Sequence, residues 1–125
     1  MAGTINLTCS LRVSNGGFTD GFAPGPVSVA ETNIGVGGGS QSIPTTAGGT
    51  AIAGLGGLTA LGYAALENLD ATHFVTVGIV VSGTYYPVLK LKAREVAVLR
   101  LVPGVTYYAM ADTAAVLLLC RVWED

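Results

Sequence analysis

Apolar and polar residues alternate along much of this chain with the period of a β-strand. Between Thr4 and Ser14 the apolar residues are Ile5, Leu7, Cys9, Leu11 and Val13, and the polar residues between them are Asn6, Thr8, Ser10 and Arg12. Successive side chains of a strand point to opposite faces, so this pattern predicts a half-buried strand. Asn15-Gly16-Gly17 predicts a turn after it, and Val27 to Ala30 a short further strand.

The second half of the chain carries the same signal in shorter segments. The segments rich in β-branched and aromatic residues are Phe74 to Val81, Thr84 to Lys92, Glu95 to Leu101, Val105 to Met110 and Ala115 to Trp123. Turn pairs such as Ser82-Gly83 and Pro103-Gly104 separate them, and no helical period appears. This spacing predicts one all-β domain over residues 1–125, an antiparallel β-sandwich or a barrel. The last segment is apolar on both faces, so we expect it to be central or covered by a partner.

Residues 32–66 form a tract without any charged side chain, and ten of these residues are glycine. Within it, Ala51 to Leu66 is nearly all apolar but shorter than the roughly 20 residues of a membrane-spanning helix. A membrane-interfacial segment is one alternative for this run. The favoured interpretation is two buried strands with a glycine-rich bend around residues 54–62. Gly35 to Ser40 lacks the Lys-Ser/Thr ending of a phosphate-binding loop.

Charged residues make up only 11% of the chain, although half of its residues are apolar. An ordinary soluble domain has about 25% charged residues. We therefore expect other subunits to cover part of the surface, and a soluble monomer is the alternative. The net charge is −2. The only basic cluster, Lys90, Lys92 and Arg94, fits the solvated face of an edge strand, so we expect no nucleic-acid partner.

Candidate chemistry is sparse along the chain. His73 is the only histidine, and most carboxylates fall at turns or near the last residue, so we expect neither catalysis nor a bound metal or cofactor. Cys9 and Cys120 are expected to be buried free thiols, or a disulfide if the first and last strands are neighbours. Met1 to Asn6 lacks the pattern of a signal peptide, so we expect synthesis in the cytoplasm and no membrane association.

Tyrosines and leucines supply the candidate contact residues. Outward-facing tyrosines are favoured in interfaces, and apolar residues in an uncharged tract need cover. The residues expected in an interface are Leu55, Leu58, Tyr85, Tyr86, Tyr107 and Tyr108.

Several segments of the second half together resemble a protein family. They are Asn68-Leu69-Asp70-Ala71-Thr72-His73-Phe74-Val75-Thr76-Val77-Gly78, Tyr86-Pro87-Val88-Leu89-Lys90-Leu91-Lys92, Glu95-Val96-Ala97, Leu99-Arg100-Leu101, Tyr107-Tyr108-Ala109-Met110-Ala111-Asp112-Thr113-Ala114-Ala115-Val116 and Trp123-Glu124-Asp125. With them, residues 63–125 resemble short phage-encoded virion proteins that recur beside head and tail genes. Members of that family often carry Asn at the position of His73 and Pro-Gly at Ala93-Arg94. The shape of the turn before Glu95 is therefore not carried over from the family.

The resemblance implies a jelly-roll-like β-sandwich on the virion of a tailed bacteriophage. It implies a capsid decoration or cement protein on the capsid surface, with the major capsid protein, other virion proteins and further copies of itself as partners. The alternative is a tail, neck or fibre component. A secreted adhesin or membrane-active protein is a third class, and the missing targeting signal counts against it. No catalytic or ligand-binding residue is implied.

Overall fold

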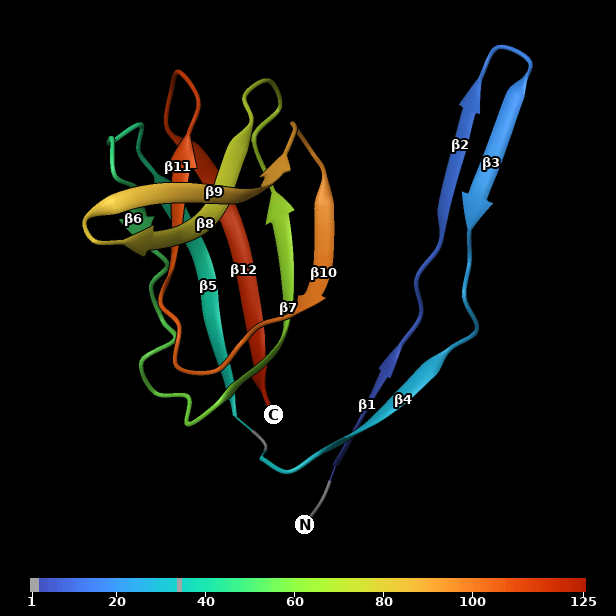
Figure 1. Ribbon diagram of the computed structural model, residues 1–125, viewed down its shortest axis with the longest axis horizontal. Coiled ribbons are helices and arrows are strands. Elements are labelled where there is room, and N and C mark those ends of the chain that lie inside the picture. Colours follow the sequence, from blue (N-terminus) through green and yellow to red (C-terminus); the bar gives the residue numbers. More distant parts are fainter. Residues whose placement is uncertain (1–2, 34) are drawn as a thin grey trace. The chain divides into compact units, whose positions relative to one another are not determined.

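The computed structural model describes residues 3–33 and 35–125, which form two compact units (Figure 1). The first unit is Met1–Asn33 and the second is Ile34–Asp125. The described residues form twelve strands and no helix, so they include no helix long and apolar enough to cross a membrane. The all-β class predicted from the sequence is confirmed.

The first unit is a long antiparallel hairpin. Strand β1 (Gly3–Leu7) pairs with β4 (Val27–Glu31), and β2 (Leu11–Asn15) pairs with β3 (Phe18–Phe22). Gly16 adopts a φ of 60°, which glycine reaches without strain, and so reverses the chain between β2 and β3.

This hairpin differs from the predicted first strand of a single sandwich over residues 1–125. Residues 8–10 interrupt the predicted strand, and its two parts pair only with segments of the same unit. Alternation predicts strands but does not say which strand lies beside them. The sandwich is therefore formed by the second unit alone.

The second unit contains eight strands in two four-stranded antiparallel sheets. They are β5 (Val36–Ile43), β6 (Thr50–Ala51), β7 (Leu61–Asn68), β8 (Val75–Val81), β9 (Thr84–Leu91), β10 (Val96–Arg100), β11 (Tyr107–Ala111) and β12 (Val116–Glu124). One sheet has the order β10-β7-β12-β5 and the other the order β6-β11-β8-β9. Most strands that follow each other in the chain therefore lie in different sheets. The last strand, β12, lies beside β5, the first strand of this unit.

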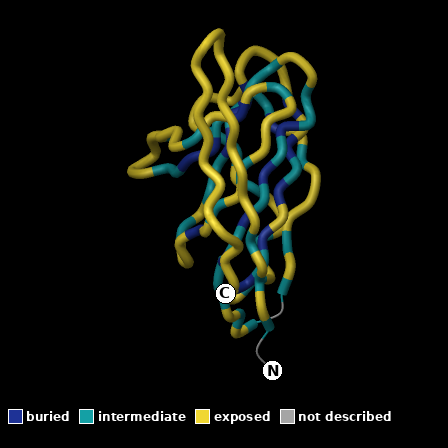
Figure 2. Tube along the Cα trace, turned by 90° about the vertical axis from the view of Figure 1, so that its right-hand side faces the viewer, coloured by how far each residue is buried: buried dark blue, intermediate teal, exposed yellow. Residues whose placement is uncertain are grey.

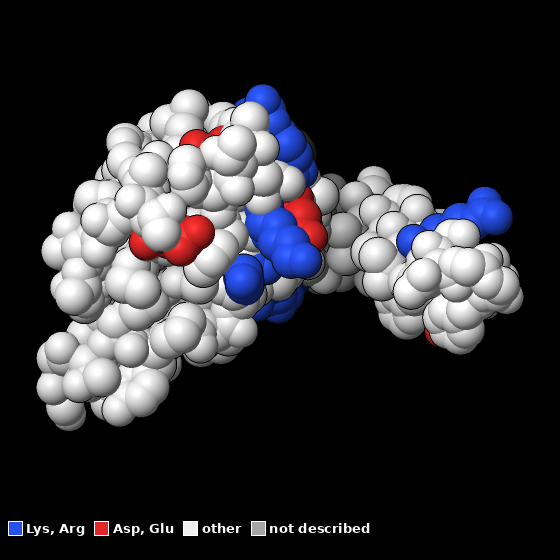
Figure 3. All heavy atoms as spheres, turned by 90° about the horizontal axis from the view of Figure 1, so that it is seen from above, with Lys and Arg blue, Asp and Glu red and all other residues white. Residues whose placement is uncertain are grey.

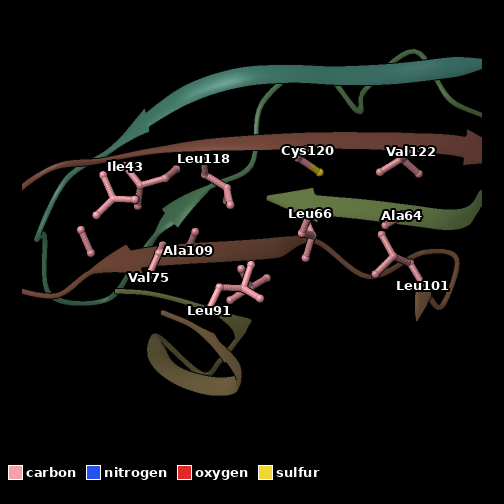
Figure 4. Close-up of a cluster of buried hydrophobic side chains, with 13 residues drawn as sticks. Ile43, Ala64, Leu66, Val75, Leu91, Leu101, Ala109, Leu118, Cys120 and Val122 are labelled. Carbon is pink, nitrogen blue, oxygen red and sulfur yellow. The ribbon is translucent and has the colours of Figure 1, made fainter. Parts of the chain in front are cut away.

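The core lies between these two sheets. Strand β12 contributes four buried apolar residues, Val116, Leu118, Cys120 and Val122, at alternate positions. Ile43, Ala64 and Leu66 join them from the same sheet, and Val75, Leu91 and Ala109 point toward them from the other (Figure 4). Period-two alternation places one side of each strand in this layer, and its burial is what holds the sandwich together.

The last strand occupies the central position that its apolar composition predicted. β12 pairs with β5 on one side and with β7 on the other. Its second apolar face, which includes Leu117 and Leu119, points away from the core.

The uncharged tract of residues 32–66 spans β5, β6, most of β7 and the loops between them. The bend expected around residues 54–62 is an irregular segment over residues 52–60. The strand expected before it is only the two-residue β6, because Gln41 binds this segment instead. The Gln41 side chain donates to the Ala51 carbonyl at 3.1 Å and accepts from the Ala53 N–H at 2.9 Å.

Two turns of the sandwich contain a non-glycine residue with a positive φ. Ser82 and Gly83 both have positive φ, at 51° and 80°, which makes the β8–β9 connection a type I′ hairpin turn. Arg94 has a φ of 66°, and the Glu95 N–H donates to the Lys92 carbonyl at 3.1 Å. A positive φ at the third of four residues is typical of a type II turn. The turn before Glu95 therefore has the backbone form that a Pro-Gly pair favours.

The expected basic face of an edge strand is not formed. Lys90 lies in β9, but the strand ends at Leu91, and Lys92 and Arg94 lie in the turn that follows. The Lys90 ammonium instead lies 3.8 Å from the centre of the Phe74 ring.

Candidate interaction surfaces

The polar residues of the loop between β7 and β8 hold the loop itself in place. Asp70 Oδ1 accepts hydrogen bonds from the N–H groups of Thr72 and His73, each at 2.7 Å. His73 Nδ1 lies 3.2 Å from the same oxygen. The N–H donors of His73 and Thr72 lower the pKa of Asp70 to about 2. His73 thus contributes to a turn, and the described residues contain no group of three or more His, Cys, Asp or Glu side chains that could hold a metal ion.

Asn68, at the end of β7, is the central polar residue of the same region. It is fully buried, and its side-chain amide donates to the carbonyl oxygens of His73, Leu91 and Lys92. Its Oδ1 accepts from the Asp70 N–H at 2.9 Å. Asn68 therefore joins the ends of β7 and β9 to the loop that enters β8.

Glu124 is the second buried polar residue of the sandwich. Its carboxylate accepts hydrogen bonds from the backbone N–H groups of Gly35 and Thr59. A side chain at Gly35 would collide with this carboxylate, because a Cβ there would lie 2.5 Å from it. Glu124 thus fixes the start of β5 and the end of the 52–60 loop to the last strand.

The two cysteines are both free, and they differ in environment. Cys9 is exposed and Cys120 is buried in the core. The disulfide left open by the sequence is not formed, and Cys9 is not the buried thiol that was expected. Burial raises the pKa of the Cys120 thiol to about 11.

One face of the hairpin carries large apolar residues that no part of its own unit covers. The register of β2 and β3 places Leu11 opposite Phe22, Val13 opposite Asp20 and Asn15 opposite Phe18, all on one side. This side is called the hairpin face below. Leu11, Phe18 and Phe22 are 61%, 59% and 62% exposed, and no described residue of this unit is fully buried (Figure 2). An isolated two-stranded hairpin is at best marginally stable in water, so this face calls for a partner.

The second surface that its own unit leaves uncovered is the side of the β10-β7-β12-β5 sheet that points away from the core. It is called the outer face below. Its residues are Val36, Gly38, Ser40, Ser42, Tyr63, Ala65, Glu67, Val96, Val98, Arg100, Leu117, Leu119, Arg121 and Trp123. Val96 and Val98 are 66% and 53% exposed. In the view of Figure 3, charged side chains of the larger unit gather mainly in one region, and much of the remaining surface is uncharged.

The structure separates the six residues that the sequence proposed for an interface. Leu55 and Leu58 are half-buried in the 52–60 loop and pack against the core. The Tyr107 hydroxyl accepts from the Val102 N–H at 2.9 Å, and its ring also packs against the core.

The remaining three tyrosines lie on β9 and β11. Tyr85 and Tyr108 both approach Gly49, where a Cβ would lie 2.9 Å from the Tyr85 ring and 3.2 Å from the Tyr108 Cβ. Tyr86 is about half exposed. Sequence reasoning did not single out the hairpin face or the outer face. Phe18, Phe22 and the alternation of Val96 with Val98 were the available signals.

A cavity of about 60 Å³ lies inside the sandwich, where Leu66, Val77, Leu99 and Cys120 are among the apolar residues that line it. Ligand-binding pockets typically measure about 300–1,000 Å³, so this cavity is a packing gap of the core.

Comparison of the chain with protein-family models, with curated proteins and with solved structures finds no match.

Proposed function

We propose that the protein is a non-enzymatic structural protein of a tailed-phage virion, which decorates the capsid and stabilises the head by bridging neighbouring capsomers. The hairpin of residues 3–31 is its attachment arm, and its partner is the major capsid protein or another virion protein. The chain is made in the cytoplasm of the bacterial host and acts on the capsid surface.

The observation that carries this proposal is the uncovered hairpin face. Phe18 and Phe22 are each about 60% exposed. A packed Phe side chain buries about 150–250 Å², so the two rings leave on the order of 200 Å² of apolar surface in water. A capsid stabiliser needs such a surface, because it acts by burying area against its neighbours and not by chemistry.

Two further observations support the same proposal. The resemblance of residues 63–125 to phage virion proteins supports a phage particle as the setting. The orders β10-β7-β12-β5 and β6-β11-β8-β9 support a jelly-roll topology, in which eight strands form two four-stranded sheets of this kind.

The test uses heads purified from phage that lack this protein. The purified chain is added, unbound protein is removed by sedimentation, and the temperature at which heads release DNA is recorded. The wild type should bind and raise that temperature. A Phe18→Ser/Phe22→Ser variant should bind at least tenfold more weakly, since burial of each ring contributes roughly 1.5–3 kcal/mol.

A matched control carries Ser14→Ala and Thr19→Ala, which lie opposite each other on the other side of the same hairpin. It should bind like the wild type. If the Phe18→Ser/Phe22→Ser variant bound as tightly as the wild type, the hairpin would not be the attachment arm. If heads without the protein released DNA at the same temperature as heads that carry it, the protein would not be a cement protein. Electron microscopy of the virion would then show the chain in the tail, neck or fibre, if the alternative holds.

A further inference from the structure

The outer face of the β10-β7-β12-β5 sheet carries an apolar surface with a particular arrangement of charge. Its apolar residues include Val96 and Val98 on the edge strand β10 and Leu117 on the central strand β12, and these are between 45% and 66% exposed. A sheet with one face on its core can leave the other in water, but that face is then normally polar. Here the serines Ser40 and Ser42 on β5 are polar, whereas the part of the face on β10 and β12 exposes mainly valine and leucine between a few charged residues.

Four charged side chains belong to the outer face or border it, and two of them satisfy each other. Arg100 Nη1 lies 2.6 Å from Asp125 Oδ1, and the Arg100 guanidinium lies 4.6 Å from the centre of the Tyr63 ring. The other two are Glu67 on β7 and Arg121 on β12. Among the residues that the structure describes, neither side chain has a hydrogen-bond or ion-pair partner; the Arg121 guanidinium lies 5.7 Å from the centre of the Trp123 ring.

Glu67 and Arg121 are diagonal neighbours on this face. The register places Arg121 opposite Ala65 and Glu67 opposite Leu119. One unpaired cation and one unpaired anion therefore flank a small apolar centre. A surface with one charge of each sign can complement itself, because a two-fold axis passing between them brings each onto the opposite charge of the second copy.

We propose that the outer face is the contact between two copies of this chain, related by a two-fold axis, with Arg121 of each copy paired with Glu67 of the other. The valines of β10 and the leucines of β12 supply the apolar area, and the two ion pairs set the orientation. Charge complementarity across an interface mainly fixes register and excludes wrong partners. This inference goes beyond the proposed function, since the contact between copies needs no capsid.

The first measurement is the mass of the purified full chain in solution, by analytical ultracentrifugation over a concentration series. We expect the mass of two chains and not the 12.6 kDa of one. A monomer at every concentration would overturn the inference, and so would a trimer or a ring, because neither is built from one two-fold contact. If the hairpin of the same chain covered this face instead of a second copy, the chain would remain a monomer.

Charge reversal then tests the pairing. Arg121→Glu puts two acids against each other across the axis, and Glu67→Arg puts two bases there, so each variant should dimerise at least tenfold more weakly. The double variant Arg121→Glu/Glu67→Arg should regain the dimer. Lys92→Glu, a charge reversal in the turn after β9, is the matched control and should dimerise normally. Circular dichroism and thermal unfolding show that each variant is folded.

Mixing the two single variants separates a contact between copies from a contact within one chain. In a mixed dimer both ion pairs are restored, one with the native sign and one with the sign reversed, so the mixture should dimerise more tightly than either variant alone. A pair within one chain would be rescued by the double variant but not by mixing, and that result would overturn the inference. Single variants that dimerise as tightly as the wild type would overturn it as well.

Discussion

The side-chain amide of Asn68 lies 3.1 Å from the carbonyl oxygen of Leu91, and this hydrogen bond connects the two sheets of the sandwich. Asn68 ends β7 in one sheet, and Leu91 ends β9 in the other. Strands in different sheets share no backbone ladder, so their ends are held only by side chains and loops. A buried amide with all its groups bonded is a specific way to fix that geometry.

We predict that Asn68→Ala lowers the free energy of unfolding by about 3 kcal/mol. The substitution leaves three carbonyl oxygens and one N–H without their partner, and a buried unpaired polar group costs about 1–3 kcal/mol. Urea unfolding followed by circular dichroism measures the change. Asn6→Ala, an exposed asparagine on the hairpin, is the control and should change the unfolding of the sandwich by less than about 0.5 kcal/mol. A similar loss in both variants would show that Asn68 does not have this role.

The strands of the second half could be predicted because alternation and turn residues coincide there. The β8–β9 hairpin is an example, since Ser82-Gly83 supplies the two positive φ values that its turn needs. The central position of β12 also followed from its two apolar faces. Both features depend on residues that are close in the sequence.

The parts that could not be predicted depend on partners distant in the sequence. The alternation from Thr4 to Ser14 indicates strands, but not that the hairpin has no covering layer in its own unit. Leu55 and Leu58 pack on the core because Gln41 and Glu124 hold the segments around them, and nothing in the uncharged tract indicates that. The diagonal placement of Glu67 next to Arg121 depends on the register between β7 and β12, and the sequence of one strand alone does not determine that register.

Arg94→Gly should stabilise the protein, because Arg94 is held at a φ of 66° in the turn before β10. A non-glycine residue in this region costs about 1–2 kcal/mol, and the greater freedom of glycine in the unfolded chain cancels part of that gain. We expect a net gain of roughly 0.5–1 kcal/mol in thermal or urea unfolding. Ala93→Gly is the matched control. Ala93 has no positive φ, so glycine there should only destabilise. A loss of stability in Arg94→Gly would contradict the turn assignment.

The two thiols should differ in reactivity toward iodoacetamide at pH 8. The thiolate is the reactive form, and burial both shields Cys120 and raises its pKa to about 11. Cys9 is exposed, so mass spectrometry of the native protein should find one modified cysteine per chain, at Cys9. In urea both should react. Modification of Cys120 in the native protein at the rate of Cys9 would show that the core opens readily at β12.

Asp70 should make stability depend on pH in the acid range. The His73 and Thr72 N–H groups hold its pKa at about 2, below the value of about 3.9 for an unfolded chain. Between these values the unfolded state binds the proton and the folded state does not, so stability rises with pH there. The contribution of Asp70 is therefore complete above about pH 5 and is lost as the pH falls through about 4 to about 2.

Asp70→Asn removes the titrating group, so the melting temperature of this variant should lie below that of the wild type at pH 6, and the difference should shrink toward pH 2. Asp112→Asn is the control, because Asp112 bonds to the described residues through its backbone N–H and not through its carboxylate. If the difference between wild type and Asp70→Asn were the same at both pH values, the carboxylate of Asp70 would not be what holds this loop.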